Sequence, residues 1–119
     1  MTQDAGSRLT VTKLFRFSSS FERNEKIHGR NYTLGVVLEG LPEEAEERFE
    51  KNMDETLIRR VHSRDLGLHA DFLKARDFTD SSLLEAFRPF VRQAADPAKV
   101  RSLWLERDRQ TRVTLECAT

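Results

Sequence analysis

The chain has 119 residues, and its 20 basic and 20 acidic side chains cancel to a formal net charge of zero. A chain of this length builds one domain with its own core, so we expect a single domain over residues 1–119, with residues 1–7 disordered. The balanced charge argues against nucleic acid or an anionic membrane as a partner. No apolar run approaches the ~20 residues that cross a bilayer, and the single cysteine, Cys117, excludes an internal disulfide. We therefore expect a cytoplasmic protein.

Two stretches near the N-terminus alternate between apolar and polar residues, which predicts strands with one buried face. The first covers residues 8–19 and the second residues 31–39, with a polar connection at 21–30. Lys13 interrupts the first stretch. The apolar positions are Leu9, Val11, Phe15, Phe17, Tyr32, Leu34, Val36 and Leu38. We expect the two strands to pair as an antiparallel hairpin.

The middle of the chain predicts two amphipathic helices. Pro42 suits the first turn of a helix, and a stripe of apolar residues at a spacing of four follows it. The stripe consists of Ala45, Phe49, Met53, Leu57 and Val61. Thr79 or Asp80 caps the second helix, which is expected to run to about Ala94. Pro89 lies inside the second helix and is expected to kink or split it, because proline removes one hydrogen bond of the ladder.

The C-terminal part alternates again over residues 100–107 and 111–117, which predicts a second hairpin with its turn at 108–110. The expected element order is β-β-α-α-β-β. This order indicates an α+β fold, in which two helices cover one face of a four-stranded antiparallel sheet.

Two motifs in the first hairpin resemble a known family. FRFSSSF (residues 15–21) and HGRNYTLGVVLEG (28–40) are similar to the FxFSAxH and HGHNYxVxVxxxG signatures of the 6-pyruvoyltetrahydropterin synthase and 6-carboxytetrahydropterin synthase family. The resemblance implies the tunnelling fold (T-fold), with the β-β-α-α-β-β order given above. It also implies ring assembly with sites between subunits, so we expect a homo-oligomer that is trimer-based, such as a hexamer.

The family holds a catalytic zinc through three histidines, and the matching positions here are Phe21, His28 and Arg30. A guanidinium stays protonated and has no lone pair for a metal, and a phenyl ring has no donor atom. We therefore expect no metal here and no cofactor. The resemblance places the family's catalytic cysteine near Asn24, whose amide cannot replace a thiol.

The same resemblance implies residues that move protons. RDLGLH (residues 64–69) is similar to the family's LDHxxLN motif, whose aspartate and histidine assist proton transfer. Asp65 matches the aspartate, but Leu66 takes the histidine position. Asp65, His69 and His28 are therefore the candidate catalytic residues, and whether His69 replaces the missing histidine stays open.

The implied ligand-binding residues lie on three elements. FTDSSLLEAF (residues 78–87) takes the place of the family's PTxEN-L motif and keeps Thr79, while LWLERD (103–108) resembles VxVxET. Glu106 then matches a glutamate that binds the amino-pyrimidine edge of a pterin. A carboxylate can accept two parallel N–H bonds from such a ring. Alternatively, Glu106 is an exposed strand residue paired with Arg101 or Arg112. Arg30 would supply a fixed cation for an anionic or carbonyl oxygen of the ligand.

Three functions stay open at this point. The first is a metal-independent enzyme of the lyase or cyclase type that acts on a pterin-like or other small molecule at a subunit interface. The second is a zinc-dependent synthase of the same family with unusual ligands, in which His28, His62 or His69 converges with a carboxylate. The third is a non-catalytic oligomeric module that binds or regulates.

Overall fold

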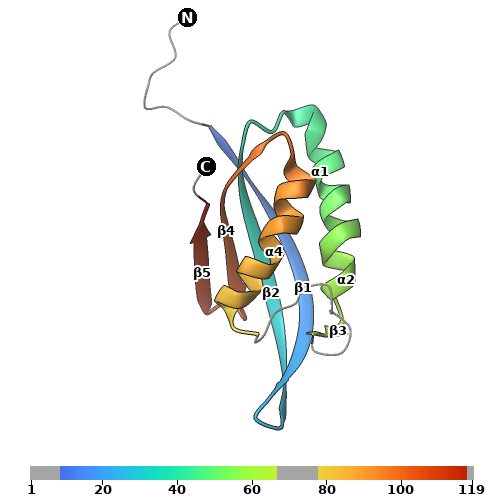
Figure 1. The fold of residues 1–119 in the computed structure, drawn as a ribbon, viewed down its shortest axis with the longest axis vertical. Helices are drawn as coiled ribbons and strands as arrows, with labels where there is room; N and C mark the ends of the chain where they lie inside the picture. Colours follow the sequence, from blue (N-terminus) through green and yellow to red (C-terminus); the bar gives the residue numbers. More distant parts are fainter. Residues whose placement is uncertain (1–8, 67–77, 118–119) are drawn as a thin grey trace, which may run out of the picture.

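The computed structural model describes residues 9–66 and 78–117, so the predicted disorder of residues 1–7 and the predicted role of His69 lie outside the described residues. Five strands form one sheet in the order β3-β1-β2-β4-β5, and the helices pack on one of its faces (Figure 1). Within the described residues, no helix combines the length and apolar character that a membrane crossing requires.

The first hairpin is longer than the sequence predicts. Strands β1 (Thr10–Arg23) and β2 (Lys26–Glu39) have 14 residues each and pair antiparallel along their whole length. The expected polar connection at 21–30 is therefore wrong, because only Asn24 and Glu25 lie between the strands. Both have positive φ angles, 53° and 64°, as a two-residue hairpin turn with the right twist requires. The hairpin end extends beyond the other strands (Figure 1).

The first helix is confirmed and contains an unexpected wide turn. A 3₁₀ turn, η1 (Glu43–Ala45), leads into α1 (Glu46–Met53), a π-turn, η2 (Asp54–Ile58), and α2 (Arg59–Val61). Apolar residues spaced by four drift about 40° per step around an α-helix of 3.6 residues per turn. A π-turn contains more residues per turn than an α-helix, so it partly reverses this rotation. The stripe consequently stays buried at Phe49, Met53, Leu57 and Val61.

Lys13 interrupts the apolar pattern of β1 and yet lies on the helix-facing side of the sheet. Its ammonium binds the carboxylates of Glu46 and Glu50 on α1. The hydrogen bond to Glu46 is the largest cause of a raised pKa for Lys13, and Glu50 adds to it. A lysine at a core-parity position thus ties the first strand to the first helix.

The second helix, α4 (Asp80–Ala95), runs through Pro89 without a break. Of the two expected effects of Pro89, a split helix is therefore wrong, and a kink stays a prediction. Proline removes a single N–H donor, and the helix keeps a buried face on both sides of it. Its buried apolar residues are Leu83, Leu84, Phe87, Val91 and Ala95. Thr79 is the N-cap, since its Oγ1 accepts the backbone N–H of Ser82 at 3.3 Å.

The C-terminal hairpin is confirmed as β4 (Lys99–Arg107) and β5 (Thr111–Glu116). An additional strand, β3 (Arg64–Asp65), pairs in parallel with Ser19 and Ser20 of β1. The sheet therefore has five strands and is mixed, instead of four strands that are all antiparallel. A strand of two residues is too short to show alternation in the sequence.

The two faces of the sheet differ. Side chains such as Phe17, Leu34 and Leu105 point to the helices and form the core. The other face has no helix on it within the described residues (Figure 1). There Trp104 lies over Gly35, its neighbour on β2, and the Arg112 guanidinium carbon lies 3.8 Å from the indole centroid. We call this face the open face.

Candidate functional site

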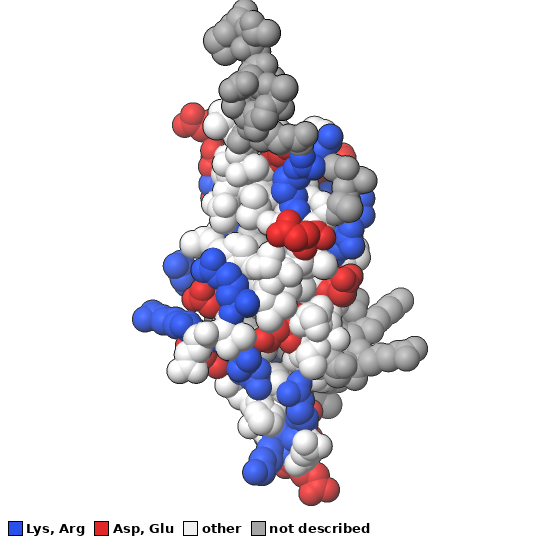
Figure 2. Space-filling view, turned by 90° about the vertical axis from the view of Figure 1, so that its left-hand side faces the viewer, with Lys and Arg blue, Asp and Glu red and all other residues white. Residues whose placement is uncertain are grey.

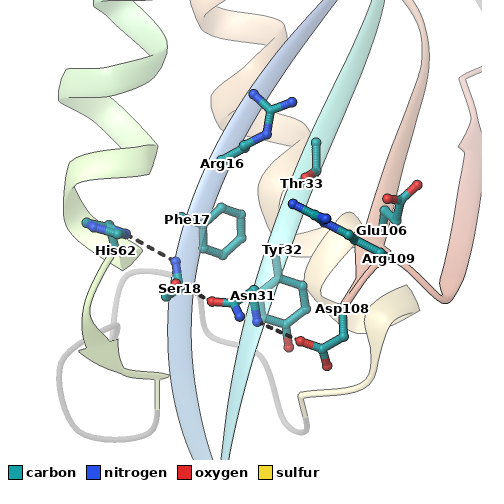
Figure 3. A pocket seen from close by; sticks show the side chains of 10 residues that line it. All are labelled: Arg16, Phe17, Ser18, Asn31, Tyr32, Thr33, His62, Glu106, Asp108 and Arg109. Atoms are coloured by element: carbon teal, nitrogen blue, oxygen red, sulfur yellow. Dashed lines mark hydrogen bonds between the residues drawn. The ribbon is translucent and has the colours of Figure 1, made fainter.

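A pocket of about 480 Å³ lies at one end of the open face. It crosses β1 and β2 and reaches the end of β4 and the β4–β5 turn (Figure 3). We call it the open-face pocket. Its lining residues are Arg16, Phe17, Ser18, Asn31, Tyr32, Thr33, His62, Glu106, Asp108 and Arg109. This volume is in the range of sites for small organic ligands, roughly 300–1,000 Å³.

Glu106 supplies the carboxylate of the pocket. It pairs across β2 with Thr33 and across β5 with Arg112. The Arg112 Nη2 and Nε donate to Oε2 of Glu106 at 2.9 and 3.3 Å. Of the two partners considered from the sequence, Arg112 is the one that this structure shows, whereas Arg101 pairs with Glu39. Both of these bonds use one oxygen, and a carboxylate has about four lone-pair sites, so Glu106 keeps capacity for a ligand.

Polar side chains of the two central strands surround this carboxylate. The Ser18 hydroxyl donates to the Asn31 side-chain oxygen at 2.6 Å, and the Asn31 backbone N–H donates to Asp108 at 3.1 Å. These bonds fix the floor of the pocket. Arg16 and Arg109 have no ion-pair partner among the described residues, so two free cations stand beside the fixed carboxylates.

A stacked aromatic pair lies beneath the pocket. Phe17 and Tyr32 are cross-strand partners whose ring centroids are 5.1 Å apart. Within residues 9–66 and 78–117, the buried Tyr32 hydroxyl has no hydrogen-bond partner, and neither has Oδ1 of Asp80, whose other oxygen accepts from Arg107 Nε at 3.1 Å. Burial raises the pKa of Tyr32 to about 12, so this phenol stays neutral at physiological pH. Tyr32 therefore supports the pocket as a neutral, rigid ring.

The structure adds to the pocket His62, which the sequence offers only as a possible zinc ligand and which is exposed at the end of α2. It follows α2, and its Nδ1 accepts the backbone N–H of Ser18 at 3.1 Å. The neutral ring therefore carries its proton on Nε2, which points away from Glu106 (Figure 3). His62 closes the rim of the pocket beside the edge of β1. No sequence pattern predicts this long-range bond.

The positions that match the family's zinc histidines do cluster, but on the helix-facing side of the sheet. Phe21 is fully buried, and the ring of His28, its cross-strand partner, stacks on it at 5.4 Å. The Arg30 guanidinium lies 5.1 Å from the Phe21 ring centroid, and that of Arg23 lies at 4.9 Å. Zinc needs three or four N, S or O donors, and only His28 offers one here. The residues present do not fit zinc, and among the described residues no group of three or more His, Cys, Asp or Glu could hold a metal.

The other predicted site residues are dispersed. Asp65 lies on β3 beside β1, and Thr79 caps α4. Neither lines the open-face pocket, and neither do His28 or Arg30. Strand parity places Glu106 and Arg30 on opposite faces of the sheet, so one chain cannot bring both to the same ligand.

Comparisons with known proteins give one kind of match. No protein-family model matches the sequence, and neither does any curated protein. Among the solved structures, the chain is similar to 6-pyruvoyl tetrahydropterin synthase from Caenorhabditis elegans, with a TM-score of 0.76 and 14% sequence identity. The match covers 94% of this chain and 97% of that chain. The fold is therefore the T-fold of 6-pyruvoyl tetrahydropterin synthase, with a fifth, very short strand.

Proposed function

We propose that this T-fold protein binds a small, flat, pterin-like heterocycle in the open-face pocket, with Glu106 as the anchor. A ring that carries adjacent N–H groups can donate two parallel bonds to one carboxylate. Arg112 holds this carboxylate in place. Arg16 and Arg109, which have no ion-pair partner that the described residues supply, suit carbonyl or anionic oxygens elsewhere on the same ring. The observation that carries the proposal is the position of Glu106, which the motif comparison singles out and which lines the pocket.

We further propose that the assembled protein catalyses a metal-independent reaction of the lyase type on this ligand. Proton transfer needs a titratable group within hydrogen-bond reach of the ligand. In the described part of the pocket, Nδ1 of His62 accepts the backbone N–H of Ser18, and Nε2 points away from Glu106. A neighbouring subunit would therefore bring His28, Asp65 or His69, with Arg30 as the fixed cation and Thr79 near the ligand. A homo-oligomer with its sites between subunits is part of this proposal.

A second candidate function is a non-catalytic binding module. The observation that favours it is the same absence of a correctly turned proton donor among the described residues of the pocket. Under this alternative the ligand binds at Glu106 and leaves unchanged.

A calorimetric titration of chelator-treated protein with a pterin tests the binding. We expect saturable binding without metal, and a loss of about tenfold or more in Glu106→Gln, because charge-assisted hydrogen bonds contribute about 1.5–3 kcal/mol. Glu116→Gln is the matched control, since Glu116 is an exposed glutamate on the adjacent strand that does not line the pocket. Equal binding in both variants would reject Glu106 as the anchor.

The same samples separate the two candidate functions. Chromatography of the ligand after incubation with the protein shows turnover for an enzyme and intact ligand for a binding module. A requirement for added zinc would contradict the metal-independent reaction while leaving the binding result unaffected.

A further inference from the structure

A second pocket, of about 280 Å³, lies at the opposite end of β4 from Glu106. It is formed by the C-terminal half of α4, the link from Asp96 to Ala98, the start of β4 and Cys117 after β5. β4 has nine residues, so the two pockets are separated by roughly 25 Å at about 3.3 Å per residue. No part of the proposed ligand site reaches it. We call it the α4 pocket.

The α4 pocket is strongly basic, although the chain as a whole is neutral. Arg88, Arg92 and Lys99 line it, and Asp96 is the only carboxylate among its described lining residues. Within the described part of the chain, none of the three cations is in an ion pair. The wall therefore carries an excess of two positive charges. By contrast, the surface on the β5 side of the molecule mixes both signs over uncharged residues (Figure 2).

One polar atom indicates that an acceptor is missing. The Nε of Arg88 is buried and has no hydrogen-bond partner among the described residues. A buried donor of a charged group without an acceptor costs free energy, and such groups are rare in folded proteins. Its neighbour Arg92 lies one helical turn farther on, so both guanidinium groups follow the same side of α4. An anion in the α4 pocket would neutralise the excess charge and offer acceptors to the guanidinium groups that line it.

The helix dipole does not account for this arrangement. Arg92 lies in the last turn of α4, where a cation is favourable next to the negative end of the dipole. Arg88 is a full turn earlier, and Lys99 belongs to the next strand. The dipole therefore explains one of the three cations, and it gives no reason for the buried Nε.

We propose that the α4 pocket binds a compact phosphoryl dianion. The planar fork of arginine matches phosphate oxygens with two parallel bonds, and an excess of two positive charges balances a dianion. Pro97, Ala98 and Val100 give the pocket apolar walls as well. These walls have room for a short carbon chain, so the ligand is either free phosphate or the phosphate of a small monoester.

Heteronuclear NMR of the arginine Nε–H groups tests the proposal. We expect inorganic phosphate near pH 8, at about 0.1 M ionic strength matched with chloride, to shift the Arg88 and Arg92 signals saturably. Glycerol phosphate is the second probe. Tighter binding of glycerol phosphate identifies a phosphorylated metabolite, and tighter binding of inorganic phosphate identifies the free ion. A response to phosphate no larger than that to chloride would overturn the proposal.

Two variants and a control make the test specific. Arg92→Gln and Arg88→Gln should each weaken phosphate binding about tenfold or more. Arg92 is exposed, so its variant should fold even if the partly buried Arg88 cannot be replaced. Arg48→Gln removes an exposed helical arginine outside the α4 pocket and should leave the affinity unchanged. An equal loss in Arg48→Gln would show a general charge effect and no site.

Discussion

Single residues decide how the open face is built, and Gly35 is the clearest case. A Cβ on Gly35 would lie 2.0 Å from the Trp104 ring. The indole in turn lies under the Arg112 guanidinium, which binds Glu106. Glycine, tryptophan, arginine and the pocket carboxylate thus form one chain of contacts. A replacement of Gly35 should therefore also disturb the position of Glu106 in the open-face pocket.

We predict that Gly35→Ala lowers the free energy of unfolding by about 1–3 kcal/mol, since the added methyl overpacks a filled space. Urea denaturation measures this change. Gly29→Ala is the control on the same strand, where a Cβ meets nothing within 4 Å, and it should be neutral within about 1 kcal/mol. Equal effects of both replacements would mean that Trp104 does not lie on Gly35.

Tyr32 links stability to pH. Burial raises its pKa from 10.0 to about 12. Between these values the unfolded chain has lost the phenol proton while the folded chain keeps it, so the free energy of unfolding falls as pH rises. This contribution to stability is complete below pH 10.

We predict that Tyr32→Phe flattens the fall in stability between about pH 10 and 12. Near pH 7 the free energy of unfolding of the variant should match that of the parent protein or exceed it by about 1 kcal/mol, because the lost hydroxyl is buried with no partner in the described part of the chain. Urea denaturation as a function of pH gives both results, and Lys13 titrates alike in the two proteins. A loss above about 1 kcal/mol at pH 7 would indicate a partner for the hydroxyl.

The sequence identifies part of the candidate site. Glu106 is identified by its motif. The alternation of apolar and polar residues could also have identified Arg16, Asn31 and Thr33 as pocket residues, because they lie at the polar positions of the two strands. His62 could not be found in this way, since its place depends on a hydrogen bond to Ser18 across 44 positions of the chain.

At the scale of elements, periodicity predicts both helices and all four long strands, because each buries one face. Periodicity does not predict features that are independent of burial, such as tight turns and very short strands. The turn at Asn24 and Glu25 lacks the glycine that marks such turns, and β3 is too short to alternate. The π-turn Asp54–Ile58 leaves no local signal apart from the uniform spacing of four.

We predict that Glu25→Gly stabilises the protein by about 1 kcal/mol, because φ is +64° at this position and glycine adopts such angles without steric cost. Thermal denaturation followed by circular dichroism measures the shift. Glu22→Gly, on the adjoining strand, should destabilise the protein by about 0.5–1 kcal/mol. Destabilisation by Glu25→Gly would contradict the two-residue turn.

At the scale of the whole molecule, the described part of the chain leaves two sheet edges open. β5 pairs only with β4, and β1 pairs only with β2 before Ser19. Open edges invite pairing with another chain, and closure of sheets into a ring removes them. Trp104 and the half-exposed Leu14 on the open face would be covered at the same time.

We predict a homo-oligomer, trimer-based and most simply a hexamer, when size-exclusion chromatography is combined with light scattering at micromolar concentration. The site that we propose between subunits requires such an assembly. A monomer at this concentration would contradict the shared site, although Glu106 could still bind the ligand within one chain.

A crystal structure of the assembled, metal-free protein with a pterin bound tests the central claim most directly. We expect the N–H edge of the ring on the Glu106 carboxylate, in the open-face pocket, with no metal nearby. Ligand density at a transition metal held by His28, with Glu106 bound only to Arg112, would contradict the account.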